Sequence, residues 1–160
     1  MKKFVFFIIT ILFSLSLYGC TFQDPKYISL SEKPNNNYYA SELQKKLLSN
    51  DNFTLYVFDT NLYKDIEVPS DEADIVENFL NSLVETNYLE DAITEKEPFR
   101  MKIVFTDSTK YLIKVFDYSN ISISPWDGNF QEDFISMENV PLGYNLFEFC
   151  NHIQNRPSSN

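Results

Sequence analysis

The stretch from Phe99 to Asp117 constrains the fold more than any other part of the sequence. Apolar and polar side chains alternate over residues 100–105 and again over 111–115, and a period of two residues indicates a strand with one buried face. Residues 107–109, Asp-Ser-Thr, have turn chemistry, so we predict an antiparallel hairpin. The residues expected on its buried face are Met101, Ile103, Phe105, Tyr111, Ile113 and Val115.

Apolar spacings of three and four predict three helices. The first covers residues 38–48 after Asn residues that can cap it, and the second begins with Ser70 as its N-cap. The third begins near residues 139–141 and carries Leu142 and Leu146 on its apolar side. Further strands are expected at 53–59, 63–68, 121–124 and 134–137, with a tight turn at Asp127-Gly128. This order predicts an α+β domain, with an antiparallel sheet of four to six strands and two or three helices packed mainly on one face.

The first twenty residues have the pattern of an export signal. Lys2 and Lys3 precede an apolar run from Phe4 to Leu17, which is shorter than the roughly 20 residues of a membrane span. The closing Leu17-Tyr18-Gly19-Cys20 resembles the bacterial lipobox. That resemblance implies cleavage before Cys20, a diacylglycerol anchor on it, and a location on the extracellular face of the cell membrane. The alternatives are an ordinary cleaved signal or a retained anchor helix.

These signals divide the chain into a lipoprotein signal peptide (1–19), a polar tether (20–37), one α+β domain (38–155) and a disordered tail (156–160). Aromatic residues make up 16% of the chain and glycine only 3 residues, which indicates an ordered globule. The formal net charge of −10 argues against a nucleic-acid partner. Once Cys20 is lipidated, Cys150 is the one remaining cysteine, so it cannot form an intrachain disulfide and is expected to be a small buried hydrophobe.

The sequence contains few residues that could carry catalysis. His152 is its single histidine, which excludes a histidine-based triad and a two-histidine zinc site within one chain. Oxygen ligands gather near Asp127 and near Asp59, but neither group has the spacing of an EF-hand loop, and we interpret both as turns. We therefore expect no enzyme activity, no cofactor and no metal site.

The opposite face of the predicted hairpin is the one candidate site. Arg100, Lys102, Lys114 and Phe116 lie there, so an uncovered face would form a basic and aromatic partner surface on an acidic molecule. In the alternative, the helix at 38–48 covers the apolar half of this face, with the Lys and Arg side chains at its rim.

The chain as a whole resembles the small uncharacterised lipoproteins of clostridial-type Gram-positive bacteria, on the Cys20 signal, the Asn-, Lys- and Ile-rich composition and the single compact domain. The resemblance implies a location and supplies no site residue. The leading hypothesis is a non-catalytic, lipid-anchored binding or interaction domain for an unknown protein or small anionic ligand. The alternatives are an inhibitor or chaperone of another exported protein, or a cell-envelope hydrolase.

Overall fold

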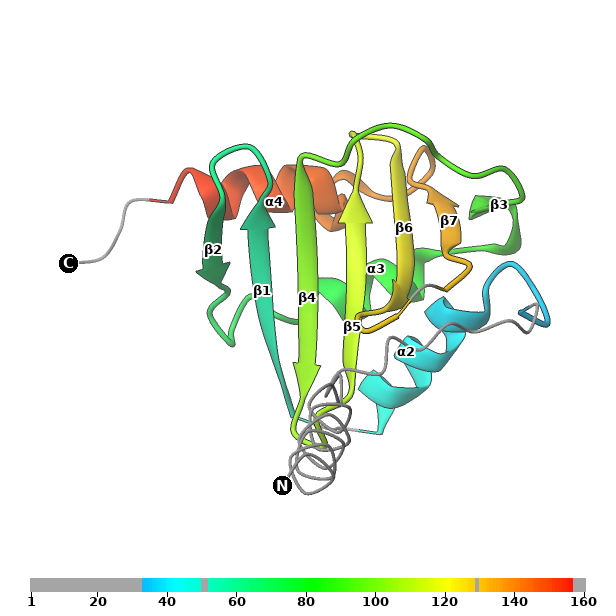
Figure 1. The fold of residues 1–160 in the computed structure, drawn as a ribbon, viewed down its shortest axis with the longest axis horizontal. Helices are drawn as coiled ribbons and strands as arrows, with labels where there is room; N and C mark the ends of the chain where they lie inside the picture. Colours follow the sequence, from blue (N-terminus) through cyan, green and yellow to red (C-terminus); the bar gives the residue numbers. More distant parts are fainter. Residues whose placement is uncertain (1–32, 50–51, 129, 157–160) are drawn as a thin grey trace, which may run out of the picture.

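The computed structural model describes residues 33–49, 52–128 and 130–156 (Figure 1). The predicted signal peptide, Cys20, most of the predicted tether and residues 157–160 lie outside these ranges. Among the helices within them, none is both long enough and apolar enough to cross a membrane.

Seven strands of the described residues form one sheet in the order β2-β1-β4-β5-β6-β7-β3, and every neighbouring pair is antiparallel (Figure 1). Their bounds are β1 Phe53–Asp59, β2 Lys64–Glu67, β3 Tyr88–Leu89, β4 Phe99–Phe105, β5 Lys110–Val115, β6 Asn120–Pro125 and β7 Asp133–Ser136. The α+β class is confirmed, but the strand count exceeds the predicted four to six. The strand that the sequence did not reveal is β3, which is too short to show an alternating pattern.

One face of this sheet, here called the inner face, forms the core. The hairpin of β4 and β5 pairs Met101 with Ile113 and Ile103 with Tyr111, as the alternation predicts. Helices α2 (Tyr38–Leu48), α3 (Ile75–Ser82) and α4 (Leu146–Gln154) bury their apolar sides in the same core, and Figure 1 shows α3 and α4 behind the sheet. The inner-face residues of the central strands are Leu55, Val57, Met101, Ile103, Phe105, Tyr111, Ile113, Val115, Ile121, Ile123 and Ile135.

Helix α2 has the predicted bounds but not the predicted cap. Asn37 occupies the N-cap position, yet its side chain makes no capping hydrogen bond. The backbone N–H of Ala40 donates instead to Oδ2 of Asp133, at 2.8 Å, from the distant strand β7. A carboxylate at this end also meets the positive end of the helix dipole.

Helix α3 begins later than predicted. Residues 70–74 form turns, in which the N–H of Glu72 donates to the carbonyl of Pro69 and that of Ile75 to Glu72, each three residues back. The N–H of Asn78 donates four residues back, to Asp74, which is the N-cap. The prediction that Ser70 is the N-cap is therefore wrong.

The last helix also begins later than predicted. Residues Leu142–Tyr144 form a 3-10 turn, and Leu142 is 66% exposed. Asn145 caps α4, because its side-chain oxygen accepts hydrogen bonds from the N–H groups of Phe147 and Glu148. The tight turn predicted at Asp127-Gly128 is also wrong, because β6 and β7 pair as an antiparallel hairpin but residues 126–132 separate them.

Candidate functional site on the outer sheet face

The other face of the sheet, here called the outer face, carries the predicted partner surface. Cross-strand register aligns Tyr56 beside Lys102 and Lys102 beside Leu112. A second row aligns Arg100 beside Lys114. The outer-face residues of the central strands are Tyr56, Phe58, Arg100, Lys102, Val104, Lys110, Leu112, Lys114, Ser122, Ser124 and Phe134.

Helix α2 does not cover this face. Its Leu43 and Leu47 side chains are buried in the core with the inner-face residues. The alternative in which this helix covers the apolar half of the outer face is therefore wrong. Lys102, Leu112 and Tyr56 remain partly exposed.

Lys102 lies at the centre of the outer face between two aromatic rings. Its Nζ is 4.8 Å from the ring centroid of Tyr56 and 5.1 Å from that of Trp126. A lysine ammonium at these distances is attracted to the negative face of each ring. Trp126 follows β6 and is 40% exposed, so this cation–aromatic group faces solvent.

The other two basic residues of the predicted surface are paired with carboxylates. Arg100 Nε donates to Oε1 of Glu97 at 2.6 Å. Lys114 Nζ contacts Oε1 of Glu132, whose other oxygen accepts from the hydroxyl of Ser122. Each basic group therefore keeps part of its donor capacity for a further partner.

Glu97 is held in its charged form. Burial raises the pKa of its carboxyl, but hydrogen bonds from its own backbone N–H and from Arg100, together with the charges of Arg100 and Lys114, outweigh burial and lower that pKa. A general acid at neutral pH needs the opposite shift. Glu97 is therefore suited to holding Arg100 in place and not to donating a proton.

Phe116 is the one residue of the predicted surface that the structure does not present to solvent. It follows the end of β5, and only 7% of its surface is exposed. Its backbone N–H donates to the carbonyl of Asn120 at 3.0 Å, across the turn that begins β6. Three further residues of this face come from loops outside the alternating pattern and were not predicted from it: Glu97, Trp126 and Glu132.

Lys33 and Asp133 form a second polar group beside β7. Lys33 Nζ donates to Oδ1 of Asp133 at 2.8 Å and to the carbonyl of Glu132 at 2.6 Å. Burial raises the pKa of Asp133, although Lys33 and the N–H groups of Ala40 and Tyr39 act in the opposite direction. Lys33 also lines a hollow of about 440 Å³ with Phe130 and seven other residues, at the edge of the sheet formed by β7 and β3.

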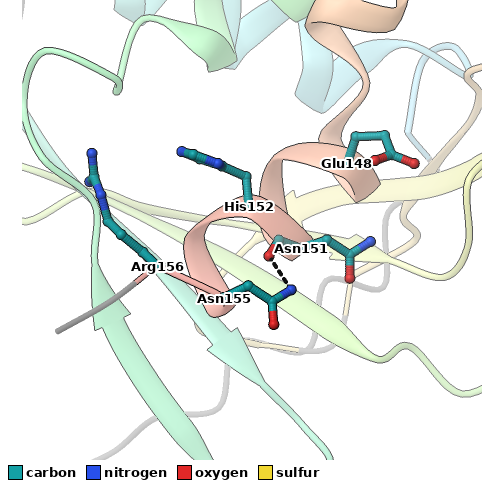
Figure 2. A pocket seen from close by; sticks show the side chains of 5 residues that line it. All are labelled: Glu148, Asn151, His152, Asn155 and Arg156. Atoms are coloured by element: carbon teal, nitrogen blue, oxygen red, sulfur yellow. Dashed lines mark hydrogen bonds between the residues drawn. The ribbon is translucent and has the colours of Figure 1, made fainter.

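A further hollow, of about 510 Å³, lies along α4. Figure 2 shows His152 and Arg156 projecting to the same side of this helix. Both contact Glu72, with His152 Nε2 3.6 Å from its Oε2. These contacts connect α4 to the turns before α3. We therefore interpret the residues that line this hollow as structural surface residues and not as a binding site.

The remaining sequence candidates have structural roles. Asp59 is buried, and its Oδ1 accepts from the N–H groups of Asn61 and Leu62, so it stabilises the turn after β1. Cys150 is fully buried in α4, and burial raises the pKa of its thiol. Within residues 33–49, 52–128 and 130–156, no three His, Cys, Asp or Glu side chains are grouped so that they could hold a metal ion.

Comparison with known proteins agrees with this fold. Residues 33–150 match the family described as "Domain of unknown function (DUF4883)". The crystal structure described as "Putative Lipoprotein from Clostridium perfringens" is similar with a TM-score of 0.70 and 28% identity, over 78% of this chain and 100% of that one. No curated protein matches the chain. The resemblance to uncharacterised clostridial lipoproteins is confirmed at the level of the family, while the Cys20 motif lies outside the described residues.

Proposed function

This chain belongs to the family of the domain of unknown function DUF4883, and we propose that it is a lipid-anchored, extracytoplasmic binding domain without catalytic activity. Its acyl chains would be attached to Cys20, at the end of the Leu17-Tyr18-Gly19-Cys20 motif. The similarity to the "Putative Lipoprotein" of Clostridium perfringens supports this anchor. The ligand would be an unknown exported protein or a small anionic molecule, bound by the outer face of the sheet.

The observation that carries this proposal is the position of Lys102 between Tyr56 and Trp126 on a sheet face that α2, α3 and α4 leave uncovered. Exposed aromatic and basic residues are enriched where proteins bind partners. A domain that buries one sheet face under three helices and leaves such residues on the other has a surface available for binding.

Binding is favoured over catalysis by the chemistry of the same face. Its carboxylates, the buried Glu97 and the partly buried Glu132, each contact a basic side chain. Catalytic acids and bases need a pKa near the working pH, and the pKa of Glu97 is lowered further below it. The polar groups of this face are therefore arranged to hold fixed charges.

Photo-cross-linking in cells tests the binding surface. A photoreactive residue replaces Lys102 in one variant and Lys45, on the exposed side of α2, in the control. We expect a discrete cross-linked product from position 102 and none from position 45. Equal products from both positions, or none from position 102, would reject the outer face as the binding surface. An exported enzyme or folding client among the products would indicate the inhibitor or chaperone alternative.

The anchor has a separate test. Cells are grown with a labelled fatty acid, and the wild-type chain is compared with Cys20→Ala. Label on the wild type that is lost in the variant supports lipidation, whereas equal label on both chains contradicts it.

A further inference from the structure

The basic residues of the outer face are concentrated over two neighbouring strands. Four of the ten lysines and arginines in the described part of the chain lie there, and we call these four the basic stripe: Arg100, Lys102, Lys110 and Lys114. Asp65 and Glu67 border it on β2, beyond the aromatic residues of β1. With a net charge of −10 on the whole chain, this stripe is the place where an acidic partner would be attracted and not repelled.

The basic stripe has a regular spacing. Lys110 lies opposite Val104, Lys102 is two residues further along β4, and the paired Arg100 and Lys114 follow after another two residues. Two residues of a strand span about 6.6–6.8 Å. An extended peptide presents alternate side chains on one side at the same spacing, so acidic residues at every second position would meet the stripe in register.

The basic groups can accept such carboxylates. Among the described residues, no carboxylate oxygen is within 4 Å of Lys102 Nζ. Arg100 has five N–H donors, and contacts Glu97 through Nε and one Nη. Its side chain is 43% exposed, so the remaining donors can be reached from solvent.

Apolar side chains alternate with the basic ones and flank them. Val104 and Leu112 lie within the stripe, with Tyr56 on one side and Trp126 on the other. These apolar groups can pack against the side chains and backbone of a peptide. A phosphate polymer has no apolar groups that could make such contacts. The combination therefore favours a polypeptide as the anionic partner.

We propose that the basic stripe binds an extended acidic polypeptide segment, with carboxylate side chains at alternating positions, laid along β4 and β5. The proposal rests on the proposed function, because it names the class of ligand for the same outer face. The segment belongs to another exported protein, and its carboxylates bind Lys102 and the free donors of Arg100, Lys110 and Lys114.

The test uses the full chain in detergent and a short synthetic peptide of alternating Glu and Thr. A second peptide has the same composition with its Glu residues contiguous, and inorganic polyphosphate is the third probe. Calorimetry measures each affinity. We expect the alternating peptide to bind about tenfold more tightly than either other probe, with an affinity that falls as salt is raised.

Two variants and a control complete the design. We expect the double substitution Lys102→Glu and Lys110→Glu to weaken the alternating peptide at least about tenfold, and Lys45→Glu on α2 to change its affinity by less than about twofold. Thermal unfolding of each variant verifies that the fold is retained. Equal binding of both peptides, tighter binding of polyphosphate, or no effect of the double substitution would overturn the acidic-segment proposal. None of these results would reject the outer face as a binding surface, because photo-cross-linking at position 102 tests that proposal independently.

Discussion

Asp133 of β7 accepts a hydrogen bond from the backbone N–H of Ala40 in the first turn of α2, although 93 positions separate the two residues. The same carboxylate binds Lys33, and its side chain has no exposed surface. We predict that Asp133→Ala lowers the free energy of unfolding by about 3 kcal/mol, because it leaves the N–H of Ala40 without its acceptor and leaves the Lys33 ammonium with only the carbonyl of Glu132. Urea unfolding followed by circular dichroism measures this value.

Glu138→Ala is the matched control for Asp133→Ala, since it removes an exposed carboxylate just after β7. We expect it to change the unfolding free energy by less than about 0.5 kcal/mol. Similar losses in the two variants would contradict a specific role for Asp133.

Asp107 gives the fold a dependence on acidic pH. The side chain of Lys46 and the backbone and side chain of Thr109 donate hydrogen bonds that lower its pKa from 3.8 to about 2. Since the folded pKa is below the unfolded one, the stability that Asp107 contributes is complete above pH 3.8 and is lost as pH falls through about 2. Titration of the carboxyl carbon by NMR should give the low pKa, and Lys46→Gln should move it back towards 3.8. A pKa near 3.8 in the unsubstituted protein would contradict the hydrogen bonds.

The sequence predicted those parts of the fold that depend on short-range patterns. The hairpin of β4 and β5 was predictable because the alternation of apolar and polar residues determines which side chains, such as Ile103 and Ile113, face the core. Helix α2 was predictable because Leu43 and Leu47 follow one another at helical spacing. The seventh strand was not, because a pair of residues such as Tyr88 and Leu89 has no period.

The contacts of the candidate site depend on residues that are distant in sequence. The sequence places Lys102 and Tyr56 on the sheet, but only the register of β1 with β4 brings that ring beneath the ammonium. It places Asn37 before α2, but the capping oxygen comes from Asp133. The partners of Arg100 and Lys114 are likewise set by how the loops before β4 and β7 fold back onto the sheet.

Asn145 should be the main local determinant of where α4 begins. Its side chain is buried, accepts from the N–H groups of Phe147 and Glu148, and donates to the carbonyl of Tyr118 at 2.9 Å. We predict that Asn145→Ala costs about 2 kcal/mol of unfolding free energy through the lost cap and the unpaired carbonyl. Asn139→Ala, in the exposed turn where the sequence suggested a helix start, should cost less than about 0.5 kcal/mol. The reverse order in urea unfolding would place the helix start at residue 139.

Cys150 should be unreactive in the folded protein. Its side chain is fully buried in α4 and burial raises its pKa, so both access and thiolate formation are suppressed. In a Cys20→Ala background, we expect a thiol reagent at pH 8 to label Cys150 far more slowly in buffer than in denaturant. Mass spectrometry of the intact chain measures the label. Equal rates in the two conditions would show that Cys150 is accessible in the folded state.

Trp126 is the single tryptophan of the chain and reports directly on Lys102. The Lys102 ammonium lies over the indole ring, so Lys102→Ala should increase quenching of Trp126 fluorescence by acrylamide. The lost cation–aromatic contacts should also lower the unfolding free energy by about 0.5–1 kcal/mol. Lys102→Arg keeps the charge over the ring and should leave quenching close to that of the unsubstituted protein, as should Lys45→Ala on α2. If Trp126 fluorescence is quenched no more in Lys102→Ala than in Lys45→Ala, the Lys102 ammonium does not lie over Trp126 in solution. The cation–aromatic group at the centre of the proposed binding surface would then be absent.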